Sequence, residues 1–242
     1  MRAETRHQLK QDRFSKVTIE AAENAAHWTV EHRAKLIAAV IAVVVIGAIA
    51  FGGWYYVNSQ DEKASAELST AVRTFETPLR PAGVPAQPGF DSFASSQERA
   101  TAARKQFQEI VDKYPHTHTA DMARYFVGLA SAQLGDNTAA ERSLQEVAGS
   151  SNASLAALGK FALASVYRAE NKHTQAIDLY KQLIDKPTLV VSKATAQLEL
   201  AGFYQSRQKP DEAKKIYDEI AKENPATEAA SLAQRRAAAL KQ

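Results

Sequence analysis

An unbroken stretch of uncharged residues lies near the start of the chain, from Leu36 to Val57. At about 1.5 Å per residue, a helix over this stretch reaches roughly 33 Å, enough to cross the hydrocarbon core of a bilayer. A cleaved signal peptide is the alternative interpretation, because Ala48, Ile49 and Ala50 have the A-x-A pattern of a cleavage site. Signal peptides usually have a shorter apolar core that begins closer to the N-terminus. The pattern therefore favours an uncleaved transmembrane helix over residues 36–57, preceded by a tail at 1–35.

From residue 97 onward, the apolar positions repeat at a nearly constant interval. A small residue is followed four residues later by a large apolar residue and three residues after that by another, the spacing of one helix face. The small residues that lead these groups are Ala103, Ala140, Ala176 and Ala213, separated by 37, 36 and 37 residues. Their large partners are Phe107 and Ile110, Leu144 and Val147, Tyr180 and Leu183, and Tyr217 and Ile220. Such an interval predicts a stacked array of similar units.

A second helical pattern precedes three of these groups and ends each time at a turn signal. The preceding small residues are Gly128, Ala164 and Ala201, and the turns are expected at Gly135, Asn171 and Gln208. Each unit is therefore expected to be a helix, a tight turn and a second helix. We predict an all-α fold, with one N-terminal transmembrane helix followed by an α-solenoid of about four helix-turn-helix repeats. The repeats occupy residues 97–242, and the alanine-rich helix at 227–241 is expected to cap their exposed core.

Residues 58–96 link the two patterns and contain a helical stripe followed by prolines. The stripe comprises Ala64, Leu68, Ala71, Val72 and Phe75. It is either the first helix of a split first repeat or an outward continuation of the membrane helix, and the pattern does not choose between them. Prolines 78, 81, 85 and 88 predict an extended loop from Thr77 to Ser96, and a flexible insertion is favoured over a binding arm.

The charges that flank the apolar stretch predict an orientation. His32, Arg33 and Lys35 precede it, whereas Asp61 and Glu62 follow it. The positive-inside rule then places residues 1–35 in the cytoplasm and the repeats on the other side of the membrane. Over the rest of the chain the charges nearly balance, with 23 Lys and Arg against 22 Asp and Glu in residues 58–242. This balance argues against nucleic acid as a partner.

The composition also narrows the possible chemistry. The chain contains no cysteine, which excludes disulfides, thiolate metal sites and a lipid-modified cysteine anchor. No metalloprotease, hydrolase or phosphate-binding motif is present. His116 and His118 are interpreted as a solvated turn between repeats rather than as zinc ligands, because two donors rarely complete a site. We therefore expect no catalytic residues, no metal, no cofactor and no small-molecule substrate.

The repeat pattern resembles the tetratricopeptide repeat family. Residues 121–136 match the first helix of that motif, with Gly128 at the small eighth position and Gly135 at the turn. The chain departs from the motif at Arg124, where the family often has Trp, and at Ser131, where it often has Tyr. The resemblance covers residues 97–242 and implies a protein-binding module with a concave groove.

The family resemblance also indicates which residues line that groove, at the second, fifth, ninth and twelfth positions of each first helix. These are Met122, Tyr125, Leu129 and Ala132; Leu158, Phe161, Ser165 and Arg168; and Thr195, Leu198, Gly202 and Gln205. Because the fifth positions are Tyr125, Phe161 and Leu198, we expect an apolar groove that binds extended or helical segments with exposed apolar side chains. The alternative is that these side chains only pack between helices.

The combination of anchor, short tail and exported repeats resembles membrane-anchored tetratricopeptide proteins of the bacterial inner membrane, notably the ancillary subunit of the SecYEG translocon. The repeat units also resemble those of the periplasmic cell-division coordinator. This resemblance implies a single-pass inner-membrane protein with a periplasmic repeat domain that binds translocating or envelope proteins like a chaperone. The alternative is a structural scaffold for an envelope or cell-division complex.

Overall fold

The computed structural model describes residues 32–81, 83–85, 92–223 and 225–240. Within these ranges every regular element is a helix, and the only β pairing is an isolated bridge between Leu79 and Phe93. The predicted all-α fold is therefore confirmed. The chain forms two compact units, which divide between Tyr56 and Val57. Most of the predicted cytoplasmic tail, residues 1–31, lies outside the described residues.

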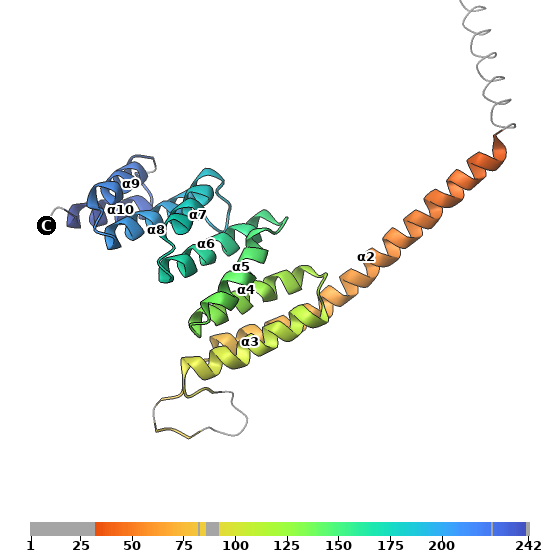
Figure 1. The fold of residues 1–242 in the computed structure, drawn as a ribbon, viewed down its shortest axis with the longest axis horizontal. Helices are drawn as coiled ribbons and strands as arrows, with labels where there is room; N and C mark the ends of the chain where they lie inside the picture. The colour runs from red at the N-terminus through yellow and green to blue at the C-terminus, as the bar shows by residue number, and fades with distance from the viewer. Residues whose placement is uncertain (1–31, 82, 86–91, 224, 241–242) are drawn as a thin grey trace, which may run out of the picture. The chain divides into compact units, whose positions relative to one another are not determined.

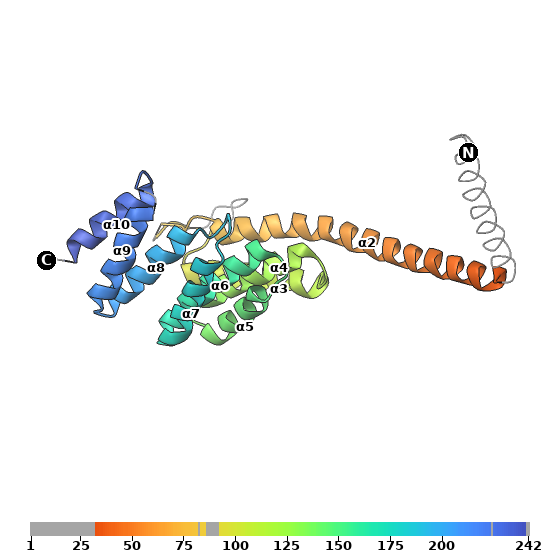
Figure 2. The same cartoon turned by 90° about the horizontal axis from the view of Figure 1, so that it is seen from above.

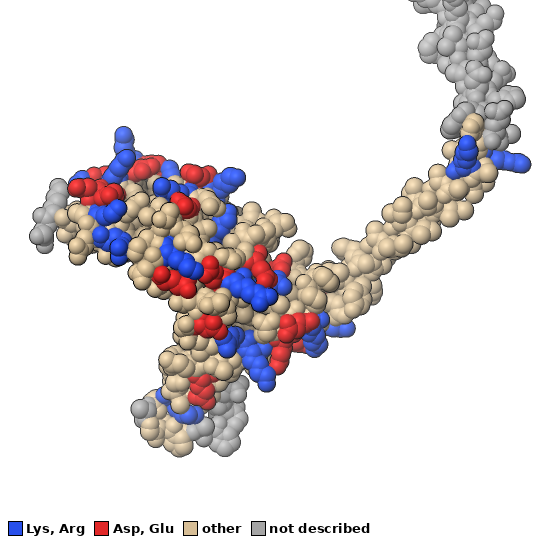
Figure 3. Space-filling model, in the orientation of Figure 1, with Lys and Arg blue, Asp and Glu red and all other residues tan. Residues whose placement is uncertain are grey.

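The first helix, α2 (Arg33–Glu76), contains the whole uncharged stretch. Along its N-terminal part the large apolar side chains, such as Val43, Ile49 and Trp54, are mostly exposed. Figure 3 shows this part as a surface without charges, with Lys and Arg gathered at its N-terminal end. By length and composition α2 can cross a membrane, although a signal sequence has the same character.

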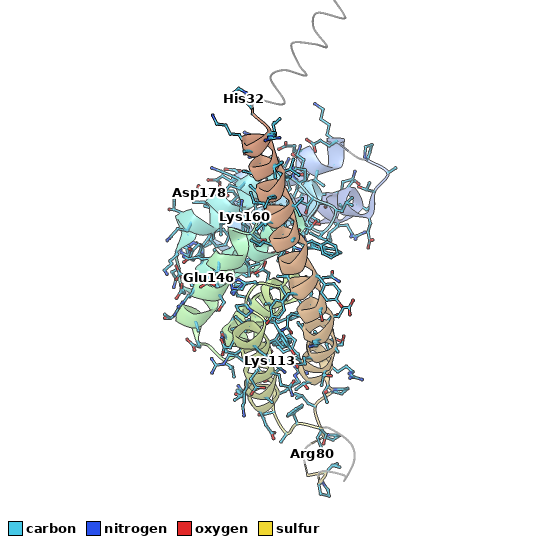
Figure 4. The ribbon with its side chains drawn as sticks, turned by 90° about the vertical axis from the view of Figure 1, so that its right-hand side faces the viewer. His32, Arg80, Lys113, Glu146, Lys160 and Asp178 are labelled. Carbon is cyan, nitrogen blue, oxygen red and sulfur yellow. The ribbon has the colours of Figure 1, made fainter. Side chains whose placement is uncertain are left out.

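The C-terminal part of α2 belongs to the second unit and packs against α3 (Ser96–Lys113). Ala64 and Ala71 are buried there beside Phe107 and Ile110 of α3. Figure 1 shows the two helices side by side, and in Figure 4 Lys113 marks the end of α3 beside α2. The predicted stripe thus lies on a helix that continues from the apolar stretch and also pairs with α3 as a first-repeat helix would. The two interpretations of residues 60–76 are compatible.

Seven further helices follow, and consecutive ones contact each other along the chain (Figures 1 and 2). They are α4 (His118–Gln133), α5 (Asn137–Ala148), α6 (Ala153–Ala169), α7 (His173–Asp185), α8 (Lys193–Ser206), α9 (Pro210–Glu223) and α10 (Glu228–Ala239). The four leading alanines, on α3, α5, α7 and α9, are all fully buried. A buried methyl group at these positions lets each helix approach its neighbour closely, which is why the sequence repeats alanine there.

Tight turns join α4 to α5, α6 to α7 and α8 to α9 at the positions that the sequence indicated. Gly135, Asn171 and Gln208 all adopt positive φ, at 77°, 59° and 57°. Glycine and asparagine tolerate this conformation, whereas glutamine adopts it at a cost in strain. Side chains of Thr117, Asn152 and Ser192 cap the first helices α4, α6 and α8 by accepting hydrogen bonds from first-turn amides.

The ends of the proline-containing loop lie close together. The backbone N–H of Arg80 donates to the carbonyl of Phe93 at 2.8 Å, and Arg99 Nη1 donates to the carbonyl of Thr77 at 2.9 Å. Residues 82 and 86–91, including Pro88, lie outside the described residues. At the other end of the array, Ala233 and Ala237 of α10 pack against Ala213 and Tyr217 of α9.

Candidate functional site

An apolar cavity of about 320 Å³ lies between the first helices of two successive repeats, α4 and α6. Five residues of the expected groove line it: Tyr125, Leu129 and Ala132 from α4, and Phe161 and Ser165 from α6. Leu144, Ala162, Val166 and Ala169 complete most of the lining, and Asn137 is its most polar member. Spacings of four and three residues place Tyr125, Leu129 and Ala132 about one turn apart on the same face of α4. An apolar side chain of a ligand could therefore lose water here.

Tyr125, Leu129 and Phe161 are half-buried in this cavity, whereas Leu144 is fully buried behind them. Tyr125 packs edge-on against Phe126, with ring centroids 5.5 Å apart, and Phe161 packs edge-on against Tyr180 at 6.2 Å. Burial also raises the pKa of the Tyr125 hydroxyl above its ordinary value of 10.0. These residues thus contribute to helix packing and still present part of their surface to the cavity.

The other residues expected in the groove are divided among different places. Met122 and Leu158 line a separate cavity of about 390 Å³, together with His116, His118 and Val190. Leu198 is half-buried against the cluster of Ala201 and Tyr217 and does not line the cavity between α4 and α6. Gln205 is exposed, and its Oε1 accepts a hydrogen bond from the Tyr217 hydroxyl at 3.3 Å.

Arg168 lies at the C-terminal end of α6, where its guanidinium contacts side chains of α7 and α8. Its Nη1 lies 3.1 Å from Glu199 Oε2 and donates to the Tyr180 hydroxyl at 3.3 Å. Its guanidinium carbon also lies 5.3 Å from the centroid of the Phe203 ring. Burial alone lowers the pKa of Arg168, but the bond to Tyr180 and the attraction of Glu199 outweigh it and raise the pKa.

Arg168 also lines a polar cavity of about 540 Å³ between α6 and α8. The remaining lining residues are Ser165, Ala169, Asn171, His173, Phe203, Ser206 and Arg207. Sequence reasoning missed His173 and Arg207, because they lie at helix ends next to turns, where helical periodicity does not indicate which way a side chain faces. It also missed Phe203, which lies inside α8 and is buried. Two of the lining residues, Ser165 and Ala169, also line the apolar cavity, so the two cavities adjoin.

A larger cleft, of about 970 Å³, is lined by residues of α3, α4 and α5. Its charged side chains pair with one another, as Arg104 Nη1 with Asp136 Oδ2 at 3.0 Å and Arg124 Nε with Glu146 Oε2 at 2.9 Å. Ser131 also lines the cleft and is fully buried, with no hydrogen-bond partner for its hydroxyl in the part of the chain that the structure describes.

The next repeat has a tyrosine at the position equivalent to Ser131. Tyr167 accepts a hydrogen bond from Gln145 of α5 at 3.0 Å. At this interface Glu141 pairs with Lys172 at 2.6 Å. The equivalent pair in the cleft is Arg104 with Asp136, so the positive and negative side chains have exchanged places. Paired charges satisfy each other, so the cleft carries little free charge for a ligand.

No grouping of three or more potential metal-ligating side chains occurs in the described ranges. His116 and His118 line the same cavity without a third ligand nearby.

Comparison with known protein families matches the tetratricopeptide repeat-like domain over residues 26–241. The chain belongs to this family. The match includes the apolar stretch of α2 as well as the repeats, and the family supports a role in protein–protein interaction. Comparison with curated proteins and with solved structures gave no match.

Proposed function

We propose that this tetratricopeptide repeat-like protein is anchored in the bacterial inner membrane by α2 and binds polypeptide clients through the apolar cavity between α4 and α6. The clients are translocating or envelope proteins on the periplasmic side, which the protein holds in a chaperone-like manner beside the translocon. The observation that carries the proposal is the meeting of Tyr125, Leu129 and Phe161 at one half-buried apolar surface.

The physical basis is the removal of apolar surface from water. An unfolded client exposes apolar side chains, and each one that enters the cavity contributes the free energy of its buried area, about 25 cal/mol per Å². A cavity of about 320 Å³ accommodates one or two such side chains at a time. Weak binding of many clients follows from so small a contact, which favours a chaperone-like role over tight recognition.

The test uses the full chain in nanodiscs and measures how well it prevents aggregation of a chemically unfolded test protein. Leu129→Lys places a charge in the cavity and should weaken client binding about tenfold or more, because desolvating the ammonium opposes apolar contact. Leu198→Lys is the matched control, since Leu198 has the equivalent position on α8 but does not line this cavity. Circular dichroism melting shows whether each variant is folded.

A folded Leu129→Lys variant that protects the test protein as well as the unsubstituted chain does would contradict the proposal. If unfolded clients do not bind at all, but cross-linking in intact membranes captures one folded envelope protein in a manner that depends on Leu129, the scaffold alternative is favoured instead.

A further inference from the structure

The polar cavity between α6 and α8 contains excess positive charge. Arg168 and Arg207 line it, and no aspartate or glutamate does. The charge of Arg168 is matched by its ion pair with Glu199, but Arg207 makes no ion pair with any residue in the described ranges. The net charge of the cavity therefore comes from Arg207.

One polar side-chain atom in the same cavity also lacks a partner. Nδ1 of His173 is buried and has no hydrogen-bond partner among the described residues. His173 is the first residue of α7, and the N-cap residue Lys172 makes no side-chain capping bond to this helix. The start of a helix favours negative charge, because its first amides point outward without intrahelical acceptors. Both features are suited to an anionic group.

The positive character continues toward α10. A Cβ built on Gly202 of α8 would lie 3.8 Å from Nη1 of Arg236. The Arg236 guanidinium therefore lies against Gly202, which has the ninth position of the family motif. Ser165 has the same family position on α6 and lines both cavities. Arg236, like Arg207, has no ion pair within the described part of the chain. Along the first helices, the groove thus changes from apolar beside α4 to basic beside α8 and α10.

We propose that the groove recognises client segments in which an acidic side chain lies close to an apolar one. The apolar side chain enters the cavity between α4 and α6, and the aspartate or glutamate carboxylate binds Arg207 in the adjoining cavity. Ser165 and Ala169 line both cavities, so the cavities adjoin. Neighbouring residues of one extended client segment can therefore enter both. Guanidinium groups bind carboxylates through short, charge-assisted hydrogen bonds, which makes them suited to this role. This inference rests on the proposed function, because it uses the same groove.

The test measures binding of fluorescent peptides to the full chain in nanodiscs by anisotropy at low salt. Each peptide has about ten residues, long enough when extended to span roughly 30 Å, and carries acetylated and amidated ends. The three peptides share a Leu-Phe pair followed by Asp-Asp, Asn-Asn or Lys-Lys. We expect the Asp peptide to bind about tenfold more tightly than the Lys peptide, with the Asn peptide between them, and salt to reduce the difference.

Arg207→Gln should remove this preference while the Asn peptide binds as before. Arg142→Gln is the control, because Arg142 is also an exposed arginine but lines the cleft of α3 to α5 instead. If all three peptides bind the unsubstituted chain equally well, the acidic preference is wrong and the apolar groove remains. Preference for Asp that persists in Arg207→Gln would overturn the assignment to this cavity.

A further peptide, with Asn-Asn and a free C-terminal carboxylate, separates the two sources of a carboxylate. Binding of this peptide as tightly as the amidated Asp peptide would overturn recognition of an internal acidic side chain. If none of the peptides binds, the proposed client-binding function fails, and this inference fails with it.

Discussion

Two glycines inside the first helices of successive repeats have very different surroundings. A Cβ built on Gly159 of α6 would lie 2.7 Å from the backbone nitrogen of Ala148 and 2.9 Å from the carbonyl carbon of Val147. A Cβ on Gly202 of α8 would meet only the tip of the Arg236 side chain. Glycine at 159 is therefore required by the close approach of α5 and α6, whereas glycine at 202 is not required by packing.

Alanine substitution should therefore have opposite effects at the two glycines. Gly202→Ala should stabilise the fold by up to about 1 kcal/mol, because alanine favours the helix over glycine. Gly159→Ala should destabilise it by about 1 to 3 kcal/mol, because the added methyl group meets backbone atoms that cannot move aside easily. Thermal unfolding of the full chain in detergent, followed by circular dichroism, measures both changes. Equal stabilisation by both substitutions would show that α5 and α6 are not in such close contact.

For single residues, the sequence predicts which side chains are buried between helices better than it predicts which side chains line the cavities. The four leading alanines recur at a fixed interval because each repeat presents the same interface, and that regularity is visible in one chain. The polar cavity is different, because Arg207 and His173 occur once each and come together only through the turns after α6 and α8. Tyr125 and Leu198 share a family position, yet only Tyr125 lines the apolar cavity, which periodicity alone does not distinguish.

At the scale of helices, the pairing of α2 with α3 combines apolar, aromatic and polar contacts. Phe107 of α3 stacks on Phe126 of α4 with ring centroids 4.9 Å apart, and Phe75 of α2 packs edge-on against both. Glu67 Oε1 of α2 accepts hydrogen bonds from Lys113 Nζ at 2.6 Å and from the Tyr114 hydroxyl at 2.8 Å. The C-terminal part of α2 is thereby fixed to the first repeat.

These polar contacts should give the α2–α3 pairing a dependence on pH. The Lys113 and Tyr114 hydrogen bonds hold the pKa of the Glu67 carboxyl below its ordinary value of 4.5. A group whose pKa is lowered on folding stabilises the fold above its unfolded pKa and loses that contribution as the pH falls through the folded value. The stabilisation by Glu67 should thus be complete above about pH 4.5 and disappear in more acidic solution.

Melting temperatures of the unsubstituted chain and of Glu67→Gln test this dependence. Glu67→Gln should melt earlier near neutral pH, and the difference should vanish below the folded pKa of Glu67. Glu62→Gln is a suitable control, since Glu62 is an exposed residue of the same helix for which no ion pair occurs in the described ranges. A difference that stays constant with pH would mean that Glu67 contributes through packing alone.

The boundaries of α2 illustrate what helical periodicity cannot provide. The apolar stretch ends at Val57, but the helix continues to Glu76, because no helix-breaking residue occurs before Pro78. A change from an apolar to an amphipathic pattern signals a change of surroundings and not the end of an element. The contacts of this segment with α3 were therefore needed to show that both interpretations of it hold.

For the whole molecule, the charges that flank the apolar stretch predict an orientation in the membrane, which remains to be tested. If the positive flank stays in the cytoplasm, protease added to sealed spheroplasts should digest the repeats and leave a protected N-terminal fragment of about 57 residues. Washing with alkaline carbonate should leave the undigested protein in the membrane, whereas a cleaved signal peptide would release the repeats. Protection of the repeats in sealed spheroplasts would contradict the periplasmic placement.

The reversed ion pairs of successive repeats bear on how the array assembles during folding. Self-similar repeats risk packing against the wrong neighbour, because their apolar faces are nearly interchangeable. Here, Arg104 meets Asp136 in one interface, whereas Glu141 meets Lys172 in the next. An exchange of neighbours would set Arg104 against Lys172 and Glu141 against Asp136, two repulsive pairs. This reversal of sign between the two interfaces favours the native order of the repeats over an exchanged one, although only modestly, because both pairs are partly exposed to water.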